Sequence, residues 1–274
     1  MLGIYFMRVG QLRDTFIEDV DHVRRPIIAI GNHLPDGYLI PPHRHRRGQL
    51  ITSATGVIVL TTKTGTWVMP PQRGLWIPPQ TEHWVRAVGT VNTQSLYSEP
   101  DSLPQMPQSC QVVGISAFMR SLLTEAMHLP ADYELGGRAG ALMALIHHEM
   151  RQLPVLPLSL PYPQHEPLLT RCRRFIQHPN VHETIDEWSD ALGMSRRAFT
   201  RFFKQETGLS FMAWRQQACL MFAMPRLVAG ESVTTVAVEL GYENPTSFSM
   251  MFKRTFGTPP LAYLGRPRAD IERA

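Results

Sequence analysis

The sequence predicts an α+β protein of two domains: an N-terminal β-barrel followed by a helical segment, and a C-terminal all-α domain with two helix-turn-helix motifs. Three observations predict this fold class. Short β-type runs fill residues 26–98, apolar residues recur at helical spacing between 116 and 153, and one helical pattern occurs twice after residue 184. A chain of 274 residues is long enough for two domains with separate cores.

The composition is that of a soluble globular chain without a strong charge. Hydrophobic residues make up 43%, charged residues 18%, and the formal net charge is +4, which excludes a disordered chain and a general polycation. The three scattered cysteines, Cys110, Cys172 and Cys219, lack metal-ligand spacing and favour a reduced setting. Because no apolar run approaches eighteen residues, we expect a cytoplasmic protein with no membrane partner.

Seven short strands are predicted in the first hundred residues. Gly, Pro and Asn separate them at short intervals, which is typical of an all-β barrel or sandwich. This pattern predicts a barrel domain over residues 1–108. The predicted strands are 26–31, 49–52, 56–61, 65–69, 74–77, 82–87 and 93–97.

A group of histidines lies inside this barrel region. Residues 37–56 contain a glycine, two histidines one residue apart, a glutamine and a second glycine, in the spacing of the first cupin motif. Residues 78–83 resemble the second cupin motif, so the resemblance implies a cupin-like barrel. Two positions depart from the pattern: Gln49 stands where that family usually has Glu, and Gln80 where it usually has Gly.

The histidines have two interpretations, which both stay open. His43 and His45 alternate on one strand and point to one face, so with His83 on a facing strand three imidazoles would converge. They line a pocket for a small organic molecule, or they hold Fe, Ni, Zn or Mn. Since the anionic ligand is absent, we favour the pocket and expect no resident cofactor. The pocket candidates are His43, His45, Gln49, Trp67, Trp76, His83 and Trp84; the metal candidates are His43, His45 and His83.

The arginines beside these histidines are expected to lie on the solvent side or the rim of the barrel. They are Arg44, Arg46 and Arg47.

Two amphipathic helices and a proline-rich linker follow the barrel. Apolar stripes at i, i+3 and i+4 predict helices over 116–128 and 136–153, which either pack on their own barrel or dimerise. Five prolines between 154 and 167 favour extended chain. We therefore expect a barrel over 1–108, a helical segment over 109–153, a semi-rigid linker over 154–167 and the second domain over 168–266.

The second domain contains the same pattern in residues 185–208 and 233–257. Each copy has an apolar helix, a Leu-Gly turn, a polar N-cap and an amphipathic helix that ends at glycine. A helix-turn-helix places its second helix in the DNA major groove. Sequence-directed binding to double-stranded DNA is therefore the leading interpretation.

Residues 165–265 resemble the AraC/XylS DNA-binding domain, and with the barrel the resemblance covers nearly the whole chain. It implies seven helices, with a long helix near 211–229 between the two motifs. Within this family the chain resembles NimR-type regulators. This resemblance implies an effector-responsive repressor of its own gene and of an adjacent drug-efflux gene. It also implies a homodimer. The resemblance is carried by Ala191-Leu192-Gly193-Met194-Ser195, Phe199, Arg201, Phe202-Phe203-Lys204, Gly208, Val236-Ala237, Leu240-Gly241-Tyr242, Ser247-Phe248, Phe252-Lys253, Phe256-Gly257 and Pro259-Pro260.

The exposed faces of the two recognition helices supply the candidate DNA contacts. In the first, Ser195 is the N-cap and phenylalanines face inward, which exposes Arg196, Arg197, Thr200, Arg201 and Lys204. Of these, we assign Arg197, Thr200 and Arg201 to base edges and Arg196 and Lys204 to phosphates. In the second, Asn244 is the N-cap, Thr246, Ser249 and Met250 face DNA, and Lys253 contacts phosphate.

The two motifs are not expected to contribute equally. No Arg, Gln or Asn is expected on the second exposed face, so the second motif should discriminate bases less well. Pro225 is expected to bend or end the long helix between the motifs.

An enzyme is not expected, because the sequence has no catalytic serine, nucleotide-binding loop or paired-carboxylate motif. Two alternatives stay open: a metal-dependent cupin enzyme fused to a DNA-binding module, and a transcription activator.

Overall fold

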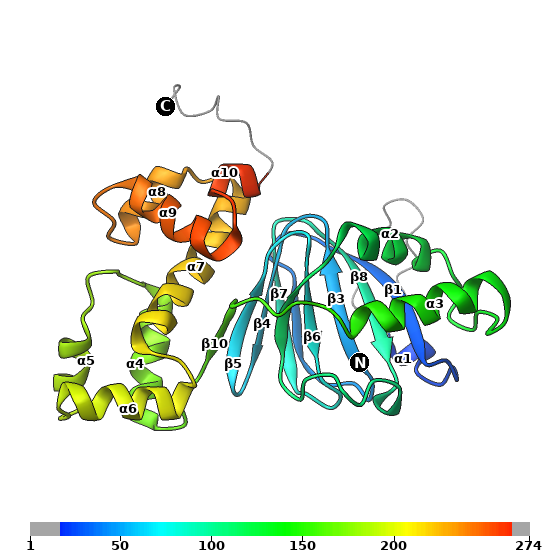
Figure 1. Cartoon of the computed structure of the whole chain (residues 1–274), viewed down its shortest axis with the longest axis horizontal. Helices are drawn as coiled ribbons and strands as arrows, with labels where there is room; N and C mark the ends of the chain where they lie inside the picture. Colours follow the sequence, from blue (N-terminus) through cyan, green and yellow to red (C-terminus); the bar gives the residue numbers. More distant parts are fainter. Residues whose placement is uncertain (1–16, 265–274) are drawn as a thin grey trace. The chain divides into compact units, whose positions relative to one another are not determined.

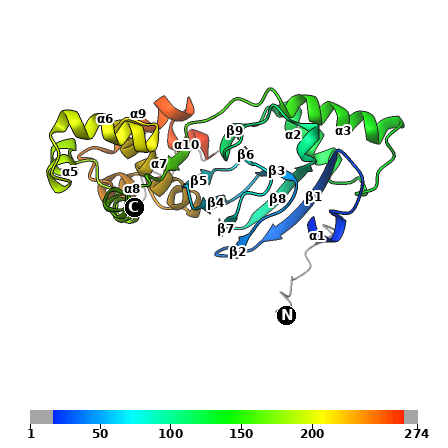
Figure 2. The same cartoon turned by 90° about the horizontal axis from the view of Figure 1, so that it is seen from below.

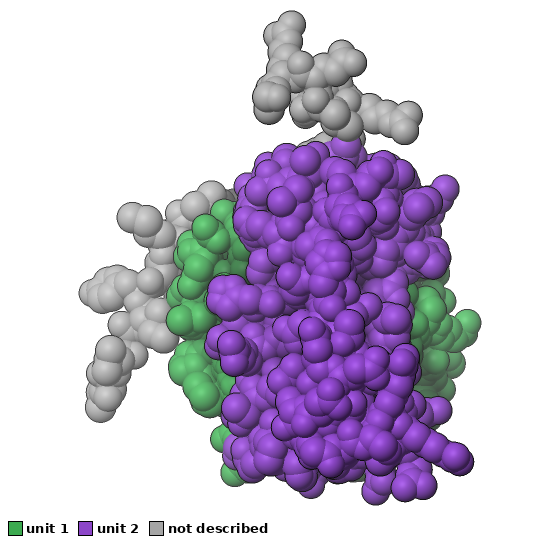
Figure 3. Space-filling model, turned by 90° about the vertical axis from the view of Figure 1, so that its left-hand side faces the viewer, with its two compact units in different colours: residues 1–62, 69–156 green, residues 63–68, 157–274 purple. Residues whose placement is uncertain are grey.

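Strands fill the first part of the chain and helices the second, as the sequence predicts (Figure 1). The computed structural model describes residues 17–264. Within them, residues 17–62 and 69–156 form one unit and residues 63–68 and 157–264 form the other, coloured separately in Figure 3. The predicted α+β fold, a β-sheet domain and a helical domain with two helix-turn-helix motifs, is confirmed.

The first unit contains two antiparallel sheets. One has the order β1-β8-β3-β6-β9, and the other contains β4, β7 and β2, with β2 at its edge. The sequence analysis missed β2 and β9. Strand β2 includes Pro41 and Pro42, which donate no backbone hydrogen bond and so hide an edge strand from sequence patterns. The bounds are α1 Ile17–Val20, β1 Ile27–Leu34, β2 Leu39–His43, β3 Gly48–Ser53, β4 Val57–Thr62, β6 Arg73–Ile77, β7 His83–Val88, β8 Val91–Ser98, the 3-10 helix Pro100–Ser102 and β9 Gln111–Gly114.

Helices α2 (Ala117–Ala126) and α3 (Gly137–Met150) lie over one face of the five-stranded sheet (Figures 1 and 2). Leu50 and Leu96 on the strands share one apolar cluster with Met119, Leu123 and Ile146 on the helices, and all are buried. Burial of apolar side chains stabilises this packing by about 25 cal/mol per Å². The two helices therefore pack on their own barrel, which is one of the two expected arrangements.

A two-stranded pair belongs to the second unit. Strand β10 (Ser159–Pro161) pairs antiparallel with β5 (Gly65–Met69), and Tyr162 forms a 2.6 Å hydroxyl–hydroxyl hydrogen bond with Thr66. The predicted linker 154–167 therefore contains a strand. Extended backbone is what its prolines favour, but the pairing partner lies about ninety residues earlier in the chain.

Seven helices make up the rest of the described part of the second unit, the number that the resemblance implies. Helix α7 runs between the group α4–α6 and the group α8–α10 (Figure 1). It continues through Pro225, so this proline does not end the helix. Among the described residues, no helix is long and apolar enough to cross a membrane. The helices are α4 Glu166–Gln177, α5 Ile185–Ala191, α6 Arg196–Thr207, α7 Phe211–Ala229, α8 Val233–Glu239, α9 Pro245–Phe256 and α10 Pro260–Tyr263.

Each helix-turn-helix has its own aromatic core. In the first, Trp188 contacts Phe203 and Trp214 at ring-centroid distances of 6.2 and 6.0 Å, and all three side chains are fully buried. In the second, Phe248 and Phe252 are fully buried with centroids 6.1 Å apart. Because aromatic pairs bury large areas, these clusters hold the recognition helices α6 and α9 against their partners.

Candidate functional site

Local capping positions the first recognition helix. The Ser195 hydroxyl accepts a hydrogen bond from the Ala198 N–H at 3.3 Å, which starts α6 at Arg196 as predicted. Helix α5 begins with a reciprocal capping box between Thr184 and Glu187, and the hydrogen bond from the Thr184 backbone lowers the pKa of the Glu187 carboxyl. Both helices of the motif therefore begin at defined residues.

The outer face of α6 presents the five predicted DNA contacts, because Arg196, Arg197, Thr200, Arg201 and Lys204 are all exposed. Arg196 pairs with Asp186 at 3.2 Å. The Thr200 hydroxyl donates to the Arg196 carbonyl at 2.8 Å, so its methyl group is the part left to contact a base. Arg197 and Arg201 make no ion pair within the described residues, which leaves both guanidinium groups available to DNA.

The second recognition helix presents a smaller cationic face. Asn244 accepts the Thr246 N–H at 2.7 Å and caps α9. Thr246, Met250 and Lys253 are exposed, whereas Ser249 is half-buried. Arg254 is also exposed, four residues after Met250 and eight after Thr246, so the expectation of no arginine on this face was wrong. The i, i+4 spacing was visible in the sequence.

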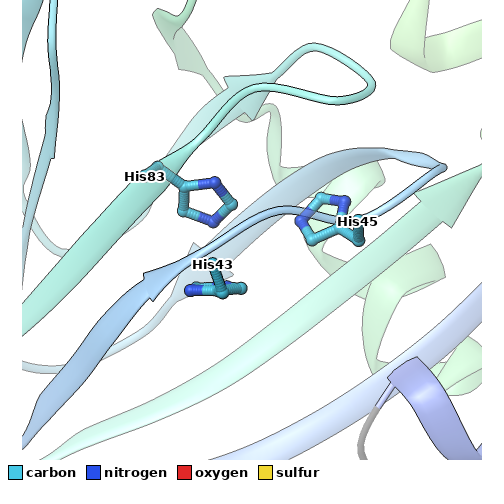
Figure 4. A group of neighbouring side chains, drawn as sticks. All are labelled: His43, His45 and His83. Atoms are coloured by element: carbon cyan, nitrogen blue, oxygen red, sulfur yellow. The ribbon is translucent and has the colours of Figure 1, made fainter.

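The structure brings the three histidines together (Figure 4). His43 ends β2 and pairs directly with His83 at the start of β7, and their ring centroids lie 4.2 Å apart. His45 follows in the loop before β3, 5.2 Å from His83. One ligand nitrogen from each ring lies within 4.8 Å of the others.

The route to this arrangement differs from the expectation in two respects. His45 is not on the strand of His43, and β7 is a neighbour of β2 in the same sheet instead of a facing strand. The register shifts between Ile40 and His43, where the two prolines lie, and β2 ends at His43, before His45.

Backbone carbonyls orient all three rings. A carbonyl can only accept, so the Nδ1 atoms of His43 and His83 carry a proton and the Nε2 of each of these rings, when neutral, keeps its lone pair. His45 differs, because its Nδ1 faces the Arg47 carbonyl and its Nε2 faces the Gln49 side-chain oxygen. Burial lowers the pKa of His83 to about 3, which keeps that ring neutral. The pairs are His43 Nδ1 with the Pro41 carbonyl at 2.9 Å, His45 Nδ1 with that of Arg47 at 2.6 Å, and His83 Nδ1 with that of Thr81 at 2.8 Å.

Gln49 adds a neutral amide to this group. Its Oε1 lies 3.1 Å from His45 Nε2, and its Nε2 donates to Ser95 Oγ at 3.0 Å and to Tyr97 OH at 2.9 Å. Sequence analysis did not single out Ser95 or Tyr97, whose places on β8 become relevant only through strand pairing with β3. The site therefore offers neutral nitrogen and oxygen donors and no carboxylate among these residues.

Gln80 takes the backbone conformation of the glycine that it replaces. Its φ is +59°, in the left-handed region, which costs on the order of 1 kcal/mol for a residue with a side chain. The Gln80 N–H donates to the His45 carbonyl at 2.9 Å. This bond ties the loop of His45 to the turn that precedes His83.

The structure does not bring the tryptophans to the histidines. The Trp76 indole donates to the Pro107 carbonyl at 2.8 Å and lies in the helix-covered core. Trp84 follows His83 directly on β7, so the two side chains point to opposite faces. Trp67 lies on β5 in the second unit, where its indole nitrogen is buried without a hydrogen-bond partner.

Arg47 corrects the expectation that the neighbouring arginines lie at the rim. It is 0% exposed, because it pairs with Asp21 at 3.1 Å and Glu99 at 2.7 Å and donates to two backbone carbonyls at 2.8 Å. Arg44 and Arg46 are exposed, as expected. A buried guanidinium is tolerated only with such complete pairing.

Comparison with known proteins agrees with both halves of this description. Residues 27–153 match the AraC-like ligand binding domain, and residues 188–266 match a helix-turn-helix domain. The chain is 33% identical over 226 residues to the HTH-type transcriptional regulator NimR of Escherichia coli (strain K12), covering 82% of each chain. It is 35% identical over 99 residues to the transcriptional activator NphR of Rhodococcus sp, which is 35% of this chain and 29% of NphR.

A solved structure is similar over most of the length. Fatty-acid-bound ToxT from Vibrio cholerae covers 90% of this chain and 98% of its own, with 10% identity and a TM-score of 0.36. The matched domains and the identity to NimR confirm the resemblance found in the sequence. The chain belongs to the AraC family of DNA-binding transcription regulators.

Proposed function

We propose that the protein is an effector-responsive repressor of its own gene and of an adjacent transporter gene of the drug-efflux type. The observation that carries the proposal is the pair of capped recognition helices with exposed polar faces, in a chain whose sheet domain holds a polar histidine group. The similarity to NimR over 82% of the chain supports repression and the efflux target.

The proposed DNA contacts follow from exposure. Arg197, Thr200 and Arg201 contact base edges, while Arg196 and Lys204 contact phosphates. On α9 the contacts are Thr246, Ser249, Met250 and Lys253, and the exposed Arg254 joins them at the phosphate backbone. Because Ser249 is half-buried and Met250 has no hydrogen-bonding group, base discrimination rests mainly on α6.

The proposed effector site is centred on His43, His45, Gln49 and His83, which offer polar groups on a rigid sheet. Of the tryptophans proposed for the same pocket, Trp67 has an unpaired indole N–H, while Trp76 and Trp84 are placed in the core and on the opposite strand face. The effector itself is a small organic molecule with hydrogen-bonding groups.

Contacts between the end of the linker and the recognition helix support a path for an effector signal. The Glu206 carboxylate on α6 accepts the N–H groups of Gln164 and His165 at 2.8 and 2.9 Å, and Phe202 packs edge-on against the His165 ring at 5.1 Å. Trp214 on α7 donates to the Pro161 carbonyl at 3.1 Å. Movement of this segment would therefore act on the recognition helix directly.

A nuclease footprint on the DNA upstream of the protein's own gene tests the proposal. We expect a salt-resistant protected tract with two major-groove contacts about one helical turn, roughly 34 Å, apart. In a reporter assay from the same promoter, deletion of the gene should raise transcription. Only diffuse, salt-labile protection would contradict specific binding at this site.

Activation is a second candidate, favoured by the similarity of 99 residues to the activator NphR. The same reporter separates the two, because loss of an activator lowers transcription. A homodimer is supported by exposed apolar side chains on and before the barrel helices, Phe118, Leu135 and Leu145, and is checked by the molecular mass in solution.

The histidine group also fits a first-row transition metal ion. Histidine ligands donate the N–H of the second ring nitrogen to a carbonyl or carboxylate, as Nδ1 of His43 and of His83 does. For His45, Nε2 would have to leave the Gln49 side-chain oxygen, 3.1 Å away, to bind the ion. Such an ion would supply a Lewis-acid centre with an open position for an effector or, in the alternative of a metal-dependent enzyme, for a substrate.

We expect one equivalent of Zn²⁺ or Ni²⁺ to bind the full chain, and His83→Gln to weaken that binding by more than about 100-fold, since removal of a ligand exceeds the effect of an outer-shell change. The exposed His148→Gln serves as the control. Metal content can be measured by mass spectrometry after titration and desalting. If both variants bind the metal ion equally well, the histidine group is not the metal site.

A further inference from the structure

A short turn between α4 and α5 contacts both helix-turn-helix motifs. It comprises residues 180–183. The Asn180 side-chain oxygen accepts the His182 N–H at 2.8 Å, and the Asn180 carbonyl accepts the Glu183 N–H at 3.3 Å. A side chain that closes its own turn in this way holds the backbone in one conformation. The turn is therefore a defined structure.

Its first contact is with the turn of the second motif. The Val181 N–H donates to the Leu240 carbonyl at 2.9 Å, directly after α8. Gly241 follows with φ +84°, and a Cβ placed on it would lie 2.6 Å from the Asn180 side-chain oxygen. The two turns thus approach so closely that a glycine is required at the point of contact.

The same turn is anchored to the first motif and to the bridging helix. The Glu183 carboxylate accepts the Trp188 indole N–H of α5 at 2.6 Å and lies 3.8 Å from Arg171 of α4. The Glu183 backbone carbonyl accepts a hydrogen bond from Arg215 of α7. Because Trp188 lies in the core of the first motif, displacement of the turn would disturb that core.

We propose that residues 180–183 form a brace that, together with α7, sets the distance and angle between the recognition helices α6 and α9. The brace thereby determines which spacing of two DNA boxes the protein accepts. Helix α7 alone is a weaker connection, since Pro225 lacks the N–H that would complete its backbone ladder. This inference rests on the proposed use of both recognition helices, and it makes Asn180 and Gly241 positioning residues that do not touch DNA.

The duplicated motif offers a matched control. Gly193 is the equivalent turn glycine of the first motif, with φ +64°, but a Cβ on it would meet no atom within 4 Å. Alanine at either position incurs similar backbone strain, because both glycines have φ in the left-handed region. Only in Gly241→Ala does the added methyl group also press against Asn180. A difference in spacer preference between the two variants therefore reports the effect of the brace.

The test is selection of binding sites by the full chain from DNA with two recognition boxes and a spacer of variable length. For the wild type and Gly193→Ala, we expect one preferred spacer, with affinity about 10- to 100-fold lower when it changes by one base pair. For Gly241→Ala, a change of one base pair in the spacer should lower the affinity by less than about threefold, or the preferred spacer length should differ from that of the wild type. The second change Asn180→Ser should restore the preference, because serine withdraws the obstructing oxygen and its hydroxyl can still close the turn.

Several outcomes would overturn the proposal. If Gly241→Ala keeps the wild-type spacer preference, the brace does not set the spacing. If Asn180→Ser fails to restore it, the effect comes from backbone strain alone. If Gly241→Ala does not fold, Asn180→Ala takes its place, because it removes the turn-closing oxygen without adding atoms. Asn180→Ala must then broaden the spacer preference, and Asn180→Ser must leave it unchanged. A wild-type selection with only one box would contradict the use of both motifs instead.

Discussion

Alanine at both Arg197 and Arg201 should abolish sequence-specific DNA binding while the fold stays intact. Both guanidinium groups are exposed on α6 and form no ion pair within the described chain, so their removal disturbs nothing in the free protein. An arginine that contacts guanine contributes about 1–3 kcal/mol, and the double variant should lose more than either single variant. The two losses are not summed, because residues four apart on a helix are neighbours. Arg201→Ala alone should cost about 1–3 kcal/mol and relax specificity at one position.

The measurement is a titration against the footprinted operator and against unrelated DNA of equal length. Specific affinity should fall towards the non-specific value, while non-specific affinity changes little beyond the loss of two charges. Arg138→Ala is the control for the single variant Arg201→Ala, because each removes one positive charge and Arg138 lies on α3, where it pairs with Glu125 at the surface. If the double variant keeps the wild-type preference for the operator, α6 is not the helix that reads the bases.

Replacement of Arg47 by methionine should destabilise the first unit by about 1–3 kcal/mol, because two part-buried carbonyls lose their donor while Asp21 and Glu99, which are 32% and 29% exposed, stay partly solvated. Arg47 is fully buried and satisfies two carboxylates and the carbonyls of Val23 and Arg25. Its loss leaves Asp21 and Glu99 facing each other with only Arg46 between them. Arg46 is 43% exposed, and surface pairs of this kind contribute little.

Amide hydrogen exchange followed by mass spectrometry suits this test, because it reports each unit separately in a chain of two units. Protection of β1 and β8 should fall in Arg47→Met, whereas α4–α10 should keep theirs. Arg44→Met provides the control, since Arg44 is exposed three residues away. Equal protection in both variants would show that the buried arginine does not stabilise the sheet domain.

The sequence by itself determined the features that depend on residues a few positions apart. Helical spacing located α6 and α9, identified Phe199 and Phe203 as buried, and predicted five of the exposed residues of α6, because neighbours within one turn share a face. Gln205, which is also exposed on α6, was not predicted. Caps at Ser195 and Asn244 follow from the same local geometry. The duplicated pattern also identified the family.

Tertiary structure alone decided which distant residues meet. His43 faces His83 because β2 pairs with β7 across a bulge, and Arg47 is buried because the segment 21–25 folds back over it. The contact of Asn180 with Gly241 joins turns about sixty positions apart, and β10 pairs with β5 across about ninety positions. Periodicity carries no information about such pairs, since they depend on the path of the whole chain and on the core that closes around it.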